Sequence, residues 1–518
     1  MNFFVFLTML TGVFENIKLC FLLFLLLFIF HKYSSGQSNN YWTRSFNEES
    51  SLLSGAVVGG GSGPTSIYYN PASISEVQNS KLSLNASLFS FDFINLKNAL
   101  GQDIDINYSR GQIEPRFVSY MIKSRRFKNW SFEVAILNNE NNKAFITEGV
   151  DEHMDILTGI PGNERYFALY QYAMTFRDDW IGAGGSVRIN DRLVAGVSMF
   201  VTIKSLNYNQ TLSIDAYPLN DSVVLQNEGD YYVASYENSE YLKFNDYRLT
   251  WKGGLLYKGD NYSIGLNITS PSLGGIYSDG KRVTRKVKQT NITSPETGEN
   301  IPDYTVVDFK EKKDVGISYK TPLSISAGFN YYFPDNKRVL YSSVEYFGEI
   351  DPYKMADAEE SQNIGPEFVS SDIIFSEWLT FISGAKPVFN AAVGYSTTLK
   401  KNLHLMCGFR TDFNSKKNVD YGEYEALNQC EYANVDMYHV TCGLSLNIFG
   451  QDIITGLQYS LGHAKDQQQL ANLSDPVEYI PSENLALQGI PTNNMKSWYN
   501  AVSIYFGASL NFGGEKEK

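Results

Sequence analysis

The sequence predicts an all-β fold: a 14-stranded antiparallel transmembrane β-barrel with an N-terminal plug inside its lumen. Three observations predict it. Beyond residue 37 no apolar run approaches the roughly 18 residues of a membrane helix, which excludes a helical membrane protein. Instead, stretches of about ten residues carry apolar side chains at every second position, the period of a strand with one face in an apolar environment. The connections between them alternate between short and long, as in outer-membrane barrels.

Composition limits the classes of protein that this chain can belong to. The 518 residues carry a formal net charge of −13 and 14% aromatic residues. This is enough apolar material for a core, which excludes wholesale disorder. A sequence pI near 5.0 argues against a nucleic-acid partner, because nucleic-acid-binding domains usually carry a basic patch. Length alone suggests about three domains, but the strand pattern predicts one large barrel.

Residues 1–36 have the features of a secretory signal peptide. Lys18 precedes an apolar run over 19–30, and small residues then lead to a cleavage site after Gly36. The run is shorter than the roughly 20 residues of a membrane helix. An uncleaved anchor that also uses the earlier apolar residues stays open, and translation could start at Met9 instead.

Fourteen segments show the alternation and define a barrel over 81–518. They are residues 81–91, 115–123, 130–138, 180–189, 193–204, 244–256, 262–270, 323–332, 338–347, 388–399, 403–412, 437–449, 453–461 and 501–512. Even-to-odd connections span three to six residues, whereas odd-to-even connections such as 139–179, 205–243 and 271–322 are long. The aromatic stretch 165–177 is assigned to the outer part of the third strand or to its loop. A β-sandwich, the alternative, predicts no such alternation.

The two faces of the predicted strands can be separated by their charges. A lipid-facing Arg or Lys at mid-bilayer costs about 2–4 kcal/mol, so charges are expected on the interior face only. In the sixth segment the two parities are Tyr247, Leu249, Trp251 and Leu255 against Asp246, Arg248, Thr250 and Lys252. The last segment alternates in the same way and ends in an aromatic residue, as outer-membrane insertion signals do.

Residues 37–80 precede the first strand and do not alternate. They contain a glycine-rich run over 54–63, but no Gly-Lys-Ser/Thr follows it, so a phosphate-binding P-loop is not indicated. The simplest interpretation is a flexible linker with a turn at Asn70-Pro71. The motif Asn70-Pro71-Ala72 stands just before the first strand, after an aromatic pair.

This motif, the fourteen segments and Thr269-Ser270-Pro271 after the seventh together resemble the FadL/TodX family of outer-membrane transporters for long-chain fatty acids and hydrocarbons. The resemblance implies a fourteen-stranded barrel closed by a plug, here residues 37–80. It implies that a hydrophobic ligand enters from outside and leaves sideways through a gap beside a kinked third strand. Asn70, Pro71 and Ala72 would lie near that gap. The long connections exceed what the family leads us to expect, so no loop residue is assigned to ligand capture.

Transport of a fatty acid requires an apolar pocket and a cation or hydroxyls for the carboxylate. The candidate lumen cations are Arg188, Lys204, Arg248, Lys252 and Arg410, and the candidate apolar lining residues are Phe200 and Met406. Alternatively, the cations pair with interior carboxylates such as Glu133, Asp246 and Glu345, and the apolar residues pack against the plug.

Catalytic and metal-binding patterns are weak. None of the mature histidines forms a His-Glu-x-x-His motif, and the three mature cysteines imply no complete disulfide framework. We therefore expect no enzyme, no metal and no cofactor; a Ser-His barrel hydrolase is the remaining catalytic alternative.

The sequence thus favours passive diffusion of a hydrophobic small molecule, such as a long-chain fatty acid, across a bacterial outer membrane. Membrane lipid, or detergent after extraction, would surround the barrel. The alternative is a protein of the same fold that serves a secretion or attachment machinery and binds a surface or secretion protein at its extracellular loops. A polar porin is a third possibility, which a plug would oppose.

Overall fold

The computed structural model describes residues 40–42, 45–61, 63–76, 81–114, 116–123, 126–219, 232–293, 300–301, 306–358, 362–363, 380–417, 434–448, 451–483 and 485–511. The predicted signal peptide over 1–36 lies outside these residues. No helix among the described residues is long and apolar enough to cross a membrane.

Strands make up most of the described chain, and each of the fourteen segments predicted from the sequence overlaps one of them. The strands are β1 (Lys81–Lys97), β2 (Ile106–Glu114), β3 (Phe117–Lys123), β4 (Trp130–Met154), β5 (Glu164–Arg188), β6 (Leu193–Pro218), β7 (Ala234–Lys258), β8 (Tyr262–Thr269), β9 (Leu273–Thr290), β10 (Ile292–Thr293), β11 (Asn300–Ile301), β12 (Val306–Ile317), β13 (Ser324–Tyr332), β14 (Arg338–Phe347), β15 (Ile350–Asp357), β16 (Gln362–Asn363), β17 (Phe381–Ala385), β18 (Val388–Lys400), β19 (Leu403–Asp412), β20 (Met437–Ile448), β21 (Gln451–Gln467), β22 (Asn472–Ile480), β23 (Leu485–Gly489) and β24 (Met495–Asn511).

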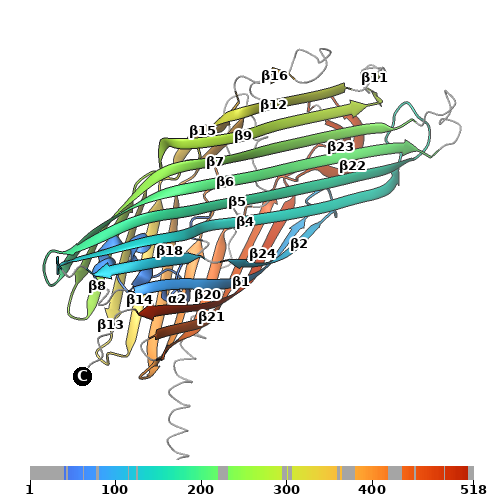
Figure 1. Ribbon diagram of the computed structural model, residues 1–518. Coiled ribbons are helices and arrows are strands. Elements are labelled where there is room, and N and C mark those ends of the chain that lie inside the picture. The colour runs from blue at the N-terminus through green and yellow to red at the C-terminus, as the bar shows by residue number, and fades with distance from the viewer. Residues whose placement is uncertain are drawn as a thin grey trace, which may run out of the picture.

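The strands pair antiparallel with their neighbours. Pairing runs from β3 through β4, β5, β6, β7, β8, β13, β14, β18, β19, β20 and β21 to β24. β24 pairs with β1, which also pairs with β3 over residues 81–85 and with β2 over residues 88–96. β9 and β12 widen the sheet beside β7. The result is a tall, strongly curved sheet (Figure 1).

Strands β4 to β7 are far longer than a membrane crossing requires. They have 25 or 26 residues each, against about ten for a tilted membrane strand. We call the parts next to the short turns, 130–138, 178–188, 193–204 and 246–258, the turn-side half. The remainders, 140–154, 164–177, 205–218 and 234–245, form the far half.

Two expectations about the long connections are wrong. Residues 165–177 belong to neither the third strand nor its loop: they open β5 and pair with both β4 and β6. The predicted connections 139–179, 205–243 and 271–322 consist largely of strand. The sequence pattern missed them because, past the turn-side half, the apolar residues change to the other face of the strand.

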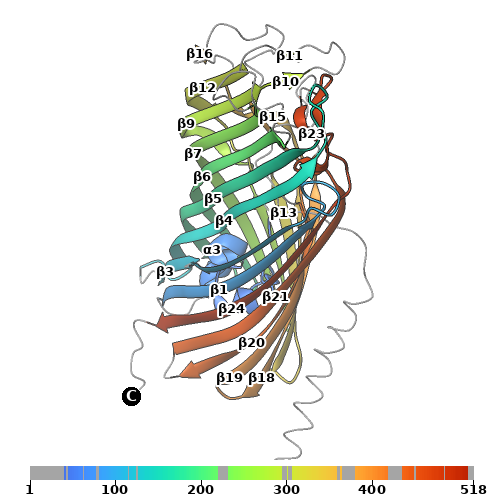
Figure 2. The same ribbon diagram turned by 90° about the vertical axis from the view of Figure 1, so that its right-hand side faces the viewer.

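The N-terminal segment, residues 45–76, packs inside the curve of the strands (Figure 2). It contains the helices α2 (Glu48–Leu52), η2 (Gly63–Thr65), α3 (Ser66–Tyr69) and η3 (Pro71–Glu76). Asn47 begins α2, since its side chain accepts a hydrogen bond from the Ser50 N–H at 2.8 Å in a capping box. We call the strand face that contacts this segment the inner face and the opposite one the outer face.

The separation of charges between the two faces is confirmed in β7. Asp246, Arg248 and Lys252 are buried on the inner face, and Trp251 and Leu255 are exposed on the outer face. An outer face of exposed apolar side chains next to lipid avoids the cost of placing charges there.

Candidate binding site on the inner face

Asn70 fixes the N-terminal segment to the strands. Its fully buried side chain donates to the carbonyl oxygens of Val58 (2.9 Å) and Leu255 (3.1 Å) and accepts from the Ala72 N–H (3.1 Å). The first bond holds two parts of the segment together, and the second joins it to β7. The third closes an Asx turn that starts η3. Pro71 suits the first position of that helix, where no N–H partner is needed.

Glycines on the strands let this motif approach closely. A Cβ added to Gly196 would lie 2.3 Å from the Pro71 carbonyl carbon, and one added to Gly254 would lie 2.1 Å from Asn70 Oδ1. Real side chains do not fit such spaces, so the contact requires glycine on both β6 and β7. η3 also packs against β4 and β5, and the pairing of β4 with β5 has a register shift between Asn138 and Glu140.

The candidate cations lie in different surroundings. Arg188 is exposed at the end of β5, whereas Lys204, Arg248, Lys252 and Arg410 are buried. Four of the five candidate cations are therefore buried, and binding of a ligand by any of them stays a prediction.

Two of the buried cations belong to a charge belt, which we define as Asp178, Lys204, Asp246 and Arg248. Lys204 Nζ lies 3.1 Å from Asp178 Oδ2, and Arg248 Nε lies 2.7 Å from Asp246 Oδ2. The carboxylates supply the partners without which buried cations would be strongly destabilising. Among Glu133, Asp246 and Glu345, Asp246 is the one that forms such a pair within the described part of the chain. Glu133 accepts a hydrogen bond from the Ile67 N–H, and Glu345 accepts from Trp42 and Ser324.

Lys252 is placed differently, at the edge of an aromatic cluster. Its ammonium lies 4.3 Å from the Tyr68 ring centroid and 5.8 Å from that of Trp180, and it donates to Thr269 Oγ1 at 3.0 Å. Cations are attracted to ring faces at these distances. The cluster around it joins the N-terminal segment to β3–β6 and comprises Phe46, Ile67, Ile74, Phe117, Met121, Ala135, Leu137, Trp180 and Phe200, with Tyr68 and Tyr69 against it.

Phe200 is fully buried in this cluster, with its ring centroid 5.3 Å from that of Trp180. Met406 instead packs with Leu52, Leu53 and Val57 of the N-terminal segment. Arg410 donates to Ser45 Oγ at 2.5 Å and so also contacts that segment. Sequence parity placed all three on the inner face, but it did not predict that Phe200 and Met406 would lie in different clusters.

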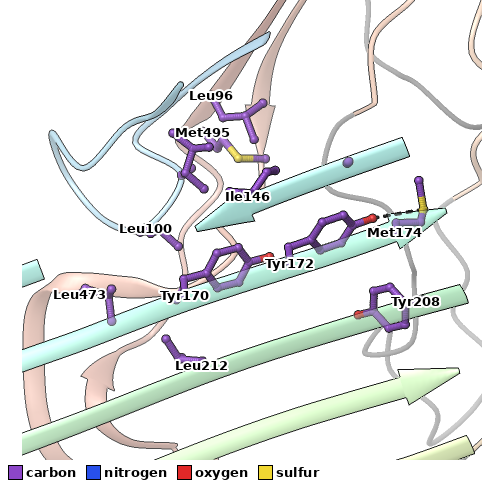
Figure 3. Close-up of a cluster of buried hydrophobic side chains, with 14 of the residues drawn as sticks. Leu96, Leu100, Ile146, Tyr170, Tyr172, Met174, Tyr208, Leu212, Leu473 and Met495 are labelled. Atoms are coloured by element: carbon purple, nitrogen blue, oxygen red, sulfur yellow. Dashed lines mark hydrogen bonds between the residues drawn. The ribbon is translucent and has the colours of Figure 1, made fainter. Parts of the chain in front are cut away.

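A second apolar cluster lies in the far half and was missed by sequence reasoning (Figure 3). Tyr170 and Tyr172 of β5 lie between Ile146 of β4 and the pair Tyr208 and Leu212 of β6, and the ring centroids of Tyr172 and Tyr208 are 5.8 Å apart. Tyr172 donates to Met174 Sδ at 3.3 Å, and Tyr166 donates to the Leu487 carbonyl of β23 at 2.9 Å. The alternation of tyrosines within 165–177 was the available signal.

Comparison with known proteins supports the architecture. No family model matches the sequence, and the search of curated proteins finds no match. The match to the crystal structure of the P. putida toluene transporter TodX covers 91% of this chain and 99% of the TodX chain, at 12% identity and a TM-score of 0.52. The match to the crystal structure of a Pseudomonas aeruginosa FadL homologue covers 92% of this chain and 100% of that chain, at 9% identity and a TM-score of 0.50. Identities this low show the fold alone: the chain has the fold of these two proteins, in agreement with the FadL/TodX resemblance of its sequence.

Proposed function

We propose that this protein is a channel of a bacterial outer membrane through which hydrophobic small molecules diffuse passively. In this proposal residues 1–36 are an export signal, residues 37–80 are the plug and residues 81–518 are a barrel of fourteen strands, with β2 and β3 as two parts of one strand. The pairing of β1 with both β24 and β3 supports that count. The glycine contacts of Asn70 and Pro71 support the plug. The toluene transporter TodX and the FadL homologue support the class of ligand.

The observation that carries the proposal is the position of Lys252. Its ammonium lies beside an apolar aromatic cluster that is formed half by the strands and half by the N-terminal segment. A cation next to apolar surface suits an amphipathic ligand, because the carboxylate and the hydrocarbon chain are recognised by different groups. Long-chain fatty acids have this chemistry. A movement of the N-terminal segment would open the cluster on one side.

Binding of two probes tests this assignment. The purified barrel is titrated with oleate and with toluene, as wild type and as Lys252→Met. We expect Lys252→Met to weaken oleate binding roughly tenfold, as the loss of one charge-assisted contact should, and to leave toluene binding unchanged. Lys337→Met removes an equal charge from an exposed turn and serves as the matched control.

The alternative, a partner protein of a secretion or attachment machinery on the same fold, is favoured by one observation. The far half of β4–β7 continues as ordered strand well past the turn-side half and is backed by the apolar cluster of Figure 3. Such a projection offers a firm surface for another protein. A wild-type barrel that binds neither probe, retains no lipid on mass spectrometry and co-purifies with an exported protein would establish the alternative.

A further inference from the structure

A cavity of about 620 Å³ opens in the wall between β7 and β9, apart from the Lys252 cluster. Asp246, Arg248 and Ser318 line its inner side, Leu273 and Tyr277 line its outer side, and Lys320 also borders it. Arg248 is buried, whereas Leu273 and Tyr277 are 52% and 58% exposed. The cavity therefore connects a buried cation with the outer, apolar face of the sheet.

The pairing of β9 with β7 explains why the wall is open here. Tyr247 pairs with Tyr277 and Leu249 pairs with Leu273, so three residues of β9, 274–276, stand opposite the single residue Arg248. This bulge carries β9 away from a regular ladder. Gly274 leaves space for the guanidinium, because a Cβ there would lie 3.1 Å from Arg248 Nη1.

The lining carries a net positive charge. Its charged residues are Arg248, Lys320 and Asp246, two cations and one carboxylate. Asp246 already accepts from Arg248 Nε at 2.7 Å and from the Tyr319 N–H at 2.6 Å. Arg248 also donates to the Ser318 hydroxyl at 2.7 Å and to the Ser272 carbonyl at 3.4 Å, which uses three of the five N–H groups of a guanidinium in contacts among the described residues.

The level of the cavity matches the boundary of a membrane. Arg248 lies ten residues from the turn end of β7 at Lys258, about the length of a tilted membrane strand. At this level the outer face changes from apolar to polar: Leu249 and Tyr247 are followed by Asn245 in β7, and Leu273 and Tyr277 are followed by Asp279 in β9. Tyr247 and Tyr277 lie with ring centroids 5.5 Å apart, as in an interfacial aromatic girdle.

We propose that this cavity binds the anionic head of a membrane lipid. A phosphate of the lipid would accept hydrogen bonds from Arg248, whose planar fork suits two oxygens of one phosphate, while Lys320 adds charge. The acyl chains would lie along the exposed Leu273 and Ile276 of the outer face. This is a site on the lipid side of the wall, and it stands independently of whether the interior conducts a ligand.

Native mass spectrometry of the detergent-purified protein tests the proposal. Phosphatidylglycerol and phosphatidylcholine compete for retention, and inorganic phosphate alone is tried separately. We expect wild type to retain one phosphatidylglycerol in preference to phosphatidylcholine, and Arg248→Gln to lower that preference roughly tenfold or more. Gly274→Leu fills the cavity while keeping the cation, and we expect it to block retention too. Arg192→Gln, at an exposed turn-end arginine, is the matched control.

Folding of each variant is checked separately by the heat-dependent shift of the barrel in gel electrophoresis. If Arg248→Gln unfolds, Gly274→Leu still tests the proposal, because the three atoms nearest to an added Cβ at Gly274 all belong to the flexible guanidinium of Arg248. Equal retention of both lipids by wild type, or unchanged retention in both folded variants, would overturn the proposal. Tight binding of inorganic phosphate without lipid would replace it with a site for a free anion.

Discussion

The turn-side and far halves of β4–β7 are built from the same strands, but the outer face is mainly apolar in the turn-side half and mainly polar in the far half. In β6 the outer face of the turn-side half carries Val197, Met199 and Val201, whereas in the far half it carries Asn207, Asn209 and Thr211. On the inner face, Ser198 and Thr202 give way to Tyr208, Leu212 and Ile214. The surroundings of a strand therefore decide which parity is apolar: in the proposed membrane location lipid lies outside the turn-side half, whereas a buried cluster lies inside the far half.

The charge belt lies where the two halves meet. Its four residues all face inward. They lie between the polar inner-face residues of the turn-side half and the apolar cluster of the far half. Substitutions in one half should therefore change the stability of that half and leave the other half unchanged.

Tyr170→Ala should destabilise the far half most. Its ring is fully buried in the apolar cluster, and truncation of a buried aromatic residue costs about 3–5 kcal/mol. Hydrogen exchange should rise in the far half and stay unchanged in the turn-side half. Tyr170→Phe is the control: its hydroxyl has no hydrogen-bond partner among the described residues, so stability should be equal or higher. Hydrogen exchange that rises equally in both halves would contradict the expectation that the two halves unfold separately.

Val197→Arg tests the lipid face. Val197 is exposed on the outer face of the turn-side half, where an Arg at mid-bilayer costs about 2–4 kcal/mol. The matched variant Thr211→Arg lies on the outer face of the far half, next to Gln171 and Ser239. For Thr211→Arg we expect the free energy of unfolding to change by no more than about 0.5 kcal/mol. Urea unfolding in vesicles gives both values, and equal losses would show that the apolar band continues into the far half.

Asn70→Ala should loosen the N-terminal segment alone. It removes the bonds to Val58 and Leu255 and leaves buried backbone groups without them, at about 1–3 kcal/mol. Limited proteolysis should then cut within residues 57–76 while the barrel remains folded on a gel. If proteolysis instead begins in the far half, the segment supports more of the barrel than its contacts indicate.

Arg165→Gln should change least. Arg165 pairs with Asp151 at 2.6 Å on the outer face of the far half, and both side chains are about half exposed. Solvent and salt screen such pairs. The unfolding midpoint of Arg165→Gln should match that of wild type at physiological salt, and a clear shift would place this pair in a less exposed environment than the structure gives it.

The sequence predicted the turn-side half well and the far half poorly, for a physical reason. Period-2 alternation located β14 and β19 with the bounds that the structure gives. It failed over 205–218 because we sought apolar residues on one constant face, whereas Leu206, Tyr208 and Ile214 continue the alternation on the other.

Pairings between distant residues could not be predicted in the same way. That Lys204 would contact Asp178, and that Lys252 would lie between Tyr68 and Trp180, depends on register and on the fold of the N-terminal segment. Register also sets Cys407 opposite Cys442, although the cysteine count alone implied no framework. The contact of Asn70 with β7 likewise depends on Gly254 lying beside it, and the sequence alone does not show that these two residues are neighbours.

The reversal of the apolar face also disfavours register shifts between neighbouring strands. In an ordinary amphipathic strand a slip of two residues restores the correct face and is opposed only by the turns. In β5, β6 and β7 such a slip would move the level of reversal by about 6.6 Å relative to the neighbouring strand. Apolar residues of the far half would then face polar ones of the turn-side half across the ladder. In long hairpins of this kind the level of the reversal therefore distinguishes the native register from every shifted register, whether the shift is by an even or an odd number of residues.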